Sequence, residues 1–282
     1  MTMNVVPSTY LFCPGNRPDR FQKALQSGAP GIIIDLEDAV PESEKDTARR
    51  DTLTWLGTLV PAVDGPQVAL RISSPTSPSG LEDLYAVVHS GALPALHTLV
   101  LPKVADASEV RILAAQLLRG APQRRLIPLI ETPGGVRAVS AIAQAHPAVS
   151  AIGFGAADFC VEAGVAFEWE ALLQVRSRLV FDCAGTGVGL LDVPYLDLAD
   201  DDGLRRECAR VKALGFLGKL AIHPRQVAAI VESFAPGASE LAWAAKVVAG
   251  FEAAGHQACA IDGRMVDEPV YLSALRITLR AG

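Results

Sequence analysis

Eight short apolar runs recur along the chain at nearly even intervals, and this repeat constrains the fold more than any other feature. The starts of the runs are spaced by about 30 residues, the length of one strand–helix unit. The runs are almost continuously apolar, as in parallel strands that are covered on both faces. They are Thr9–Cys13, Gly31–Asp38, Gln67–Ile72, Thr98–Val104, Arg125–Thr132, Ala151–Ala156, Val188–Val193 and Lys219–His223.

Segments with a helical pattern lie between most of these runs. The alternation predicts an α/β protein of the (β/α)8 TIM-barrel class. The alternative is an open, doubly wound sheet, which would favour a G-x-G-x-x-G turn after the first strand. The chain has Cys13-Pro14-Gly15-Asn16-Arg17-Pro18 at that position, so we favour the barrel. The predicted helices are Arg20–Ser27, Glu42–Leu59, Ser108–Leu118, Val136–Ala145, Glu170–Ala184, Gly203–Leu214 and Gln226–Phe234.

The repeat ends before the chain does, which predicts two domains. Residues 1–234 would form the catalytic barrel, and residues 235–282 a C-terminal helical extension or lid. Ala238–Ala260 has the pattern of an amphipathic helix, and Val270–Leu279 that of a short one. Ser73–Gly80 is the most linker-like stretch, but it falls where a barrel loop is expected.

Composition excludes several classes of protein. Of 282 residues, 50% are hydrophobic and 20% charged, which argues against disorder. The net charge is −6 without a basic block, so we expect neither nucleic acid nor an anionic membrane as a partner. Met1–Val6 lacks a signal-peptide pattern, and no run reaches the length of a membrane span. Five scattered cysteines without C-x-x-C argue against a zinc motif, and we expect a cytoplasmic protein.

Charged or titratable residues follow almost every predicted strand. In a barrel these positions meet at one end, where the active site is built. Glu131 and Asp158 follow neighbouring strands, and carboxylates without sulfur or imidazole partners suit Mg²⁺. Arg71 could clamp a substrate carboxylate, so the pattern indicates a site for a small α-keto or α-hydroxy acid. The full set is Asp35, Glu37, Asp38, Arg71, Lys103, Glu131, Asp158, Asp192 and His223.

Three of these residues also have a structural interpretation. Glu131 could cap the helix that starts near Gly134, and Asp158 could cap the next segment. Arg71 could form a salt bridge with Glu37 or Asp38. The glycines of Gly153-Phe154-Gly155 would let the backbone approach a ligand or turn sharply.

Six sequence blocks, in order along the chain, combine strand ends with the polar residues that follow them. The blocks are Tyr10-Leu11-Phe12-Cys13-Pro14-Gly15-Asn16-Arg17-Pro18, Asp35-Leu36-Glu37-Asp38-Ala39-Val40, Leu101-Pro102-Lys103-Val104, Leu129-Ile130-Glu131-Thr132-Pro133-Gly134-Gly135, Gly153-Phe154-Gly155-Ala156-Ala157-Asp158 and Ala221-Ile222-His223-Pro224. Together they resemble the citrate lyase β-subunit family, which is similar to the malyl-CoA and citramalyl-CoA lyases among Mg²⁺-dependent aldolase-like barrels. The resemblance covers essentially the whole chain.

This resemblance implies a barrel that assembles as a homotrimer or hexamer. It implies retro-Claisen cleavage of a 3-hydroxy acyl thioester into an acetyl thioester and a 2-oxo acid such as oxaloacetate. The positions that match the family's Mg²⁺ ligands are Glu131 and Asp158, and Arg71 matches its carboxylate clamp. Glu37 and Asp38 are assigned to catalysis, where they would hold metal waters and Arg71. Substrate-binding positions are Lys103, Gly134, Gly155 and Arg17, the last facing the carrier's phosphates.

The C-terminal block Gly263–Pro269 resembles a lid segment that a neighbouring subunit supplies in the related CoA lyases, which gives Asp267 a catalytic role. The alternative is a solvated turn. The chain departs from the family at Ser73, where Asn is frequent, and at Ala157, where a polar residue is frequent. Three further questions stay open: whether the carrier is CoA or an acyl-carrier protein, whether the enzyme acts instead on free hydroxy-oxo acids, and whether the barrel only binds such ligands.

Overall fold

The expected strands form one parallel sheet in the order β1 to β8 in the computed structural model, which describes residues 6–61, 65–91 and 93–279. Hydrogen bonds from the Ala221 amide to the Tyr10 carbonyl (2.9 Å), and from the Phe12 amide to the Ala221 carbonyl (2.8 Å), close the sheet. The predicted (β/α)8 barrel is confirmed. The strands are β1 (Tyr10–Pro14), β2 (Gly31–Asp35), β3 (Gln67–Arg71), β4 (Leu96–Leu101), β5 (Arg125–Ile130), β6 (Ala151–Phe154), β7 (Gly189–Asp192) and β8 (Gly218–Lys219).

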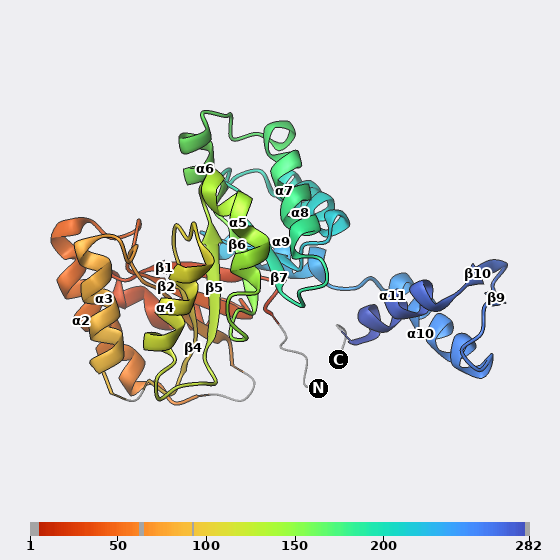
Figure 1. Cartoon of the computed structure of the whole chain (residues 1–282), viewed down its shortest axis with the longest axis horizontal. Coiled ribbons are helices and arrows are strands. Elements are labelled where there is room, and N and C mark those ends of the chain that lie inside the picture. The colour runs from red at the N-terminus through yellow and green to blue at the C-terminus, as the bar shows by residue number, and fades with distance from the viewer. Residues whose placement is uncertain (1–5, 62–64, 92, 280–282) are drawn as a thin grey trace. The chain divides into compact units, whose positions relative to one another are not determined.

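Helices cover the outside of the strands, and Figure 1 shows α2 to α5 side by side along the barrel. Short 3₁₀ turns, η1 (Pro18–Arg20) and η2 (Glu42–Glu44), precede α1 and α2. The helices of the barrel are α1 (Phe21–Leu25), α2 (Lys45–Thr58), α3 (Pro78–His89), α4 (Ala107–Leu117), α5 (Pro133–Ala143), α6 (Ala156–Ala163), α7 (Trp169–Cys183), α8 (Asp201–Leu214) and α9 (Pro224–Phe234).

The barrel interior is filled by alternate residues of the strands. Ile33, Ala69 and Leu129 belong to this buried cluster, on β2, β3 and β5. Because side chains alternate along a strand, the residue two positions further on points to the same side. Those residues are Asp35, Arg71 and Glu131, so the apolar core continues directly into a charged layer at the carboxyl ends of the strands.

A second charged cluster lies outside the barrel wall. Leu191 points into the interior, so Asp192 points outward, where it contacts Arg176 of α7 (2.8 Å) and Lys219 of β8 (2.6 Å). Lys219 also contacts Glu207 of α8, and Asp192 and Lys219 are fully buried. Our inclusion of Asp192 among the residues at the active end is therefore wrong. Side chains alternate between the two sides of a strand, and Asp192 comes one position after the inward-facing Leu191, so it faces outward.

Two helices of the barrel escaped the sequence analysis. Helix α3 begins inside the stretch that we interpreted as a loop: the Ser77 hydroxyl accepts a hydrogen bond from the Gly80 amide, and Pro78 is the first helical residue. This combination of a cap and a proline is a helix-start signal. Helix α6 has only 8 residues, too few for a clear periodicity.

Residues from Phe234 onward form a second compact unit. It contains α10 (Ala238–Ala253), α11 (Glu268–Leu279) and the antiparallel strands β9 (Cys259–Ile261) and β10 (Arg264–Val266). The helix predicted to reach Ala260 ends earlier, because Gly255 and His256 take left-handed conformations. Asp262 and Gly263, both with positive φ, form the two-residue turn between β9 and β10. That Asp-Gly pair is a hairpin signal that the analysis missed.

The core of this second unit is small and apolar. Phe251 of α10 stacks on Tyr271 of α11 with ring centroids 4.9 Å apart, and Val266 of β10 is fully buried against the same helices. In the described part of the chain, none of the helices is both long and apolar enough to cross a membrane.

Candidate active site at the barrel mouth

Arg71, the last residue of β3, is the centre of the charged layer at the barrel mouth. Its Nε and Nη2 contact the two oxygens of Asp35 at 2.6 and 2.7 Å, and this carboxylate is almost completely buried. Its Nη1 lies 2.8 Å from Glu37 Oε2 and 3.3 Å from Asp38 Oδ2. The pairing with Glu37 and Asp38, which the sequence left as an alternative, is thus present. A guanidinium has five N–H donors, and three of these four contacts are hydrogen bonds, so donor capacity remains for a ligand.

Lys103, which follows β4, contacts three of the acidic residues of the site. Its Nζ lies 2.9 Å from Glu37 Oε1 and 3.8 Å from Asp158 Oδ1, and its backbone amide donates to Glu131 Oε2 at 2.7 Å. Burial opposes the charged form of Lys103, but the contact with Glu37 raises its pKa. Lys103 takes a left-handed conformation, with φ of 53°. Such strain in a non-glycine residue persists where surrounding contacts hold it, as they do here.

Glu131, which follows β5, is the most buried of the proposed metal ligands, with 3% of its surface exposed. Burial and the nearby Glu37 raise the pKa of its carboxyl to about 8. It does not cap the following helix, because the side chain that accepts the hydrogen bond from Gly135 belongs to Thr132. The carboxylate is held by its backbone contact with Lys103 and is free to serve a cation.

Gly155 packs directly against this carboxylate. A Cβ atom at position 155 would lie 2.3 Å from Glu131 Cγ and 2.5 Å from Oε1, distances at which something must move. At Gly134 a Cβ atom would make only ordinary contacts, the nearest 3.6 Å away. Packing therefore requires a glycine at position 155 and not at position 134, and the substrate contacts of both remain predictions.

We expect Gly155→Ala to weaken Mg²⁺ binding by about 10- to 100-fold, because the new methyl group displaces the Glu131 carboxylate. Calorimetric titration with Mg²⁺ measures the effect, and circular dichroism checks that the variant folds. The control is Gly57→Ala on α2, where a Cβ atom has nothing within 4 Å. Wild-type Mg²⁺ affinity in Gly155→Ala would contradict this account of the position.

Glu37 is nearly as buried as Glu131. Burial, opposed by the charge of Arg71, raises the pKa of its carboxyl to about 7. Its Oε2 is close to Arg71 but has no hydrogen-bond partner in the described structure. A buried carboxylate oxygen without a hydrogen bond is costly, so this atom is available to a bound cation, water or substrate.

Asp158 lies in the first turn of α6, and the N-cap residue of this helix is Gly155. Its side chain is 43% exposed and faces the Lys103 ammonium. The interpretation of Asp158 as a helix cap is therefore wrong. Asp158 and Glu131 approach the mouth from consecutive strand–helix connections and share Lys103 as a neighbour.

These residues fit a divalent cation with oxygen ligands. Among the described residues, no group of three or more His, Cys, Asp or Glu side chains forms a complete metal cage. Mg²⁺ does not need one, since it takes one or two carboxylates and fills its octahedron with water and substrate oxygens. Burial, the main cause of the raised pKa of the Glu37 and Glu131 carboxyls, disfavours negative charge at this mouth, and a bound cation would favour it.

Two further predicted site residues have local contacts of their own. Arg17, in the loop after β1, is half-exposed and forms an ion pair with Asp19 at 2.9 Å. Asp267 belongs to the second unit, where its carboxylate accepts a long hydrogen bond (3.4 Å) from the Val270 amide at the start of α11. Their roles toward a carrier and a neighbouring subunit remain predictions.

Sequence reasoning listed Asp35 but gave it no role, although it is the main partner of Arg71. The available signal was register: Asp35 and Arg71 each end an apolar run, and they lie opposite one another on β2 and β3. Ser73, which departs from the family pattern, is buried, whereas Ala157 is exposed beside Asp158.

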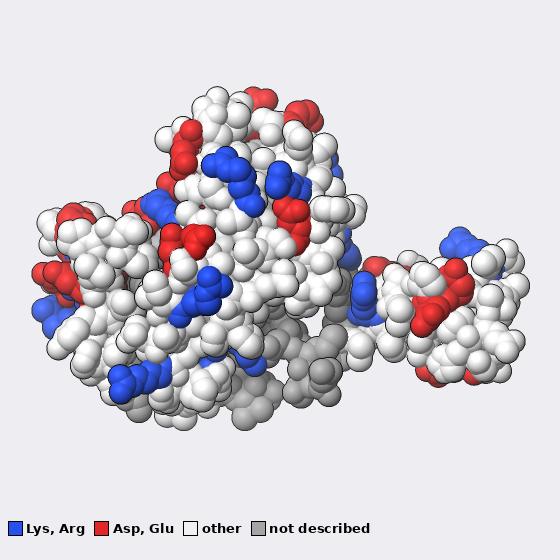
Figure 2. All heavy atoms as spheres, viewed as in Figure 1, with Lys and Arg blue, Asp and Glu red and all other residues white. Residues whose placement is uncertain are grey.

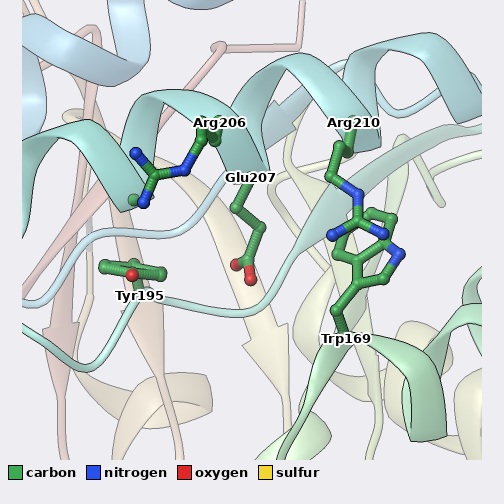
Figure 3. Close-up of a pocket in the computed structure, with 6 residues that line it drawn as sticks. Trp169, Tyr195, Arg206, Glu207 and Arg210 are labelled. Atoms are coloured by element: carbon green, nitrogen blue, oxygen red, sulfur yellow. The ribbon is translucent and has the colours of Figure 1, made fainter.

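The barrel also has a hollow of about 210 Å³ on its outer side, between α7, α8 and the loop after β7. Figure 3 shows Trp169 under Arg210. The carboxylate of Glu207 lies between the side chains of Tyr195 and Trp169. The negative charge of Glu207 in this hollow is already paired, since its carboxylate contacts the buried Lys219 ammonium. On the visible face in Figure 2, acidic and basic side chains are interspersed over the described residues.

The fold and the mouth define a class: a (β/α)8 barrel whose strand ends combine a buried guanidinium with carboxylates suited to a divalent cation. Residues 8–224 match the model of the HpcH/HpaI aldolase/citrate lyase family. The chain belongs to this family, and the resemblance stated from the sequence is confirmed.

Characterised relatives match the chain over nearly its full length. A citrate lyase subunit beta-like protein of Mycobacterium tuberculosis is 32% identical over 100% of this chain and 98% of its own length. The L-malyl-CoA/beta-methylmalyl-CoA lyase of Rhodobacter capsulatus is 31% identical over 91% of this chain and 89% of its own length. The crystal structure of CitE from M. tuberculosis, in complex with magnesium, acetoacetate and coenzyme A, is 31% identical with a TM-score of 0.78, covering 99% of both chains.

Proposed function

We propose that the protein is a Mg²⁺-dependent carbon–carbon lyase that cleaves a 3-hydroxy acyl thioester of the citryl, malyl or citramalyl type. The products are an acetyl thioester and a 2-oxo acid such as oxaloacetate. The observation that carries this proposal is the mouth itself, where the buried Arg71 and the carboxylates of Glu131 and Asp158 converge on one space. Family membership and the relatives that are named malyl-CoA lyases support the same reaction class.

Glu131 and Asp158 are the residues that would hold the cation. The solved relative that contains magnesium together with acetoacetate and coenzyme A supports this assignment. When bound, Mg²⁺ polarises an oxygen of the oxo-acid portion and offsets the charge that develops there. Lys103 holds Glu131 through its backbone amide and Glu37 through its ammonium, which keeps both carboxylates oriented toward the mouth.

Arg71 orients the substrate in this proposal. Its two hydrogen bonds to Asp35 fix the orientation of the guanidinium, and its remaining N–H donor capacity would bind a substrate carboxylate. As the C–C bond breaks, the 3-hydroxyl loses its proton to a base and the acetyl carbon gains one. The identity of that base is not assigned to any residue of the barrel. Asp267, supplied by the lid of a neighbouring subunit, is the proposed carboxylate that completes the site.

The proposal includes a CoA or acyl-carrier thioester as the carrier, with Arg17 near its phosphates. It also includes a homo-oligomer, a trimer or hexamer, since Asp267 lies in a unit separate from the barrel. The proposal also includes a cytoplasmic location, which five scattered cysteines without a C-x-x-C pair support.

The test is a substrate panel. Citryl-CoA, malyl-CoA and citramalyl-CoA are incubated with the full-length protein and Mg²⁺, and release of the 2-oxo acid is measured with and without chelator. The matching free acids form a second arm. We expect chelator-sensitive cleavage of at least one thioester and none of the free acids. Cleavage of the free acids alone would replace this proposal with an aldolase, and binding of the 2-oxo acid without turnover would reduce the protein to a binding subunit.

A further inference from the structure

The ammonium of Lys45, the first residue of α2, lies under the acidic segment that follows β2. Its Nζ donates to the carbonyl oxygens of Leu36 (2.7 Å) and Glu37 (3.0 Å) and to the hydroxyl of Ser73 (3.2 Å). An ammonium has three N–H donors, and these three acceptors account for all of them. All three are neutral oxygens, so these hydrogen bonds hold the backbone of the segment and do not pair Lys45 with a carboxylate.

This segment carries the carboxylates that surround Arg71. Leu36 and Glu37 stand between Asp35 and Asp38, and all three acids of the segment contact the Arg71 guanidinium. The segment is anchored on one side by the Leu36 amide, which donates to the Arg71 carbonyl (2.9 Å), and by the Glu37 amide, which donates to Asp35 (2.9 Å). Lys45 supplies the anchor on the opposite side, through the carbonyls of the same two residues.

Ser73 connects Lys45 to the helix layer. Its hydroxyl accepts from Lys45 and donates to the Leu36 carbonyl (3.0 Å), and its backbone amide donates to Asp83 of α3 (2.7 Å). The other oxygen of Asp83 contacts Arg49 of α2 at 2.7 Å. Ser73 and Asp83 are both almost fully buried. The network therefore ties α2 and α3 to the backbone from which Glu37 projects.

From this geometry we propose that Lys45 is a positioning residue for the active site. It touches neither the substrate nor the cation, and it acts through Glu37 and Arg71: it holds the backbone that sets the Glu37 carboxylate against Arg71 and Lys103. The inference rests on the proposed lyase function for its kinetic effect. It also assigns Ser73, the residue that departs from the family pattern, to this network and not to substrate contact.

The decisive variant is Lys45→Met, which keeps the length of the side chain and removes its charge and donors. We expect the turnover number to fall, or the Mg²⁺ dissociation constant to rise, by about 10- to 100-fold. The KM for the thioester should change by less than about threefold, since Lys45 makes no contact with substrate. Ser73→Ala should change the turnover number or the Mg²⁺ dissociation constant in the same direction by about 3- to 10-fold, the worth of one hydrogen bond. The double variant should lose no more than Lys45→Met alone, because the two residues act on the same carbonyl.

The control is Arg50→Met on the same helix, which removes an exposed positive charge. Melting temperature separates a positioning role from a purely structural one. A folded Lys45→Met variant with wild-type turnover and Mg²⁺ affinity, or one that only melts earlier, would overturn the proposal. Should Lys45→Met not fold, Ser73→Ala with wild-type turnover and Mg²⁺ affinity would overturn it instead.

Failure of the proposed function gives a different pattern. Wild-type protein that cleaves no thioester contradicts the lyase assignment alone. The calorimetric Mg²⁺ titration needs no substrate, so a weakened titration in Lys45→Met would still support the positioning role, and an unchanged one would overturn it.

Discussion

Replacing Glu131 by glutamine, or Asp158 by asparagine, is expected to reduce Mg²⁺-dependent thioester cleavage at least about a thousandfold, since a catalytic cation is worth several kcal/mol in the transition state. The amide keeps the size of each side chain but removes the anionic oxygen that a hard cation prefers. Release of the 2-oxo acid from the active thioester measures the effect. Calorimetric titration with Mg²⁺ should show the matching loss of affinity.

The control for Asp158→Asn is Glu162→Gln, which neutralises an exposed acid on the same helix, α6. It should retain wild-type cleavage and Mg²⁺ affinity. Undiminished Mg²⁺-dependent turnover in both site variants would show that the cation is held elsewhere.

Glu131→Gln has a further readout that needs neither substrate nor metal. The pKa of the Glu131 carboxyl is raised from 4.5 to about 8, so between these pH values the folded protein retains a proton that the unfolded chain has released. The Glu131 contribution to the stability of the metal-free protein therefore falls as the pH rises across this range. We expect the melting temperature of the wild type to decline more steeply with pH than that of Glu131→Gln. Equal slopes would mean that the pKa of the Glu131 carboxyl is not raised in the metal-free protein.

Replacing Arg71 by methionine is expected to destabilise the protein by about 3–5 kcal/mol, because the buried Asp35 carboxylate loses its cationic partner at both oxygens and is left with the neutral amides of Glu37 and Ala39 as donors. Urea denaturation measures the loss. Arg71→Lys should fold better, since it keeps the charge, yet cleave the thioester at least about a hundredfold more slowly, because an ammonium cannot hold Asp35 and a substrate carboxylate in one plane.

A matched surface pair provides the comparison. Arg178 contacts Asp182 on α7 at 3.0 Å, with half of its side chain exposed, so Arg178→Met should cost at most about 1 kcal/mol. Arg71→Met as stable as Arg178→Met would refute the structural role of Arg71. Wild-type cleavage by Arg71→Lys would refute the orienting role.

The barrel and most of the proposed site were predictable because they depend on local patterns. Parallel strands that are covered on both faces need continuous apolar runs, and the ends of such runs converge in a barrel. That reasoning brought Arg71, Glu37, Glu131 and Asp158 into one list before any coordinates. In the structure Lys103 contacts the three acids, and Glu37 connects them to Arg71. Helix α3 and the β9–β10 hairpin were missed although Ser77-Pro78 and Asp262-Gly263 are recognisable signals. The first lies inside a stretch already interpreted as a loop, and the second lies after the predicted helix Ala238–Ala260, in a segment that was given no secondary structure.

The sequence by itself determined the architecture of the barrel, the end at which charge collects and the family to which the chain belongs. It could do so because strand period, apolar runs and sequence blocks are properties of neighbouring residues. Only the tertiary structure decided which charged residues face one another. Asp35 and Asp192 look alike in the sequence, each ending an apolar run, but Asp35 points inward to Arg71 and Asp192 outward to Lys219. The partners of Lys45, in segments that follow β2 and β3, are likewise set by strand register and helix packing, which bring together residues far apart in the chain.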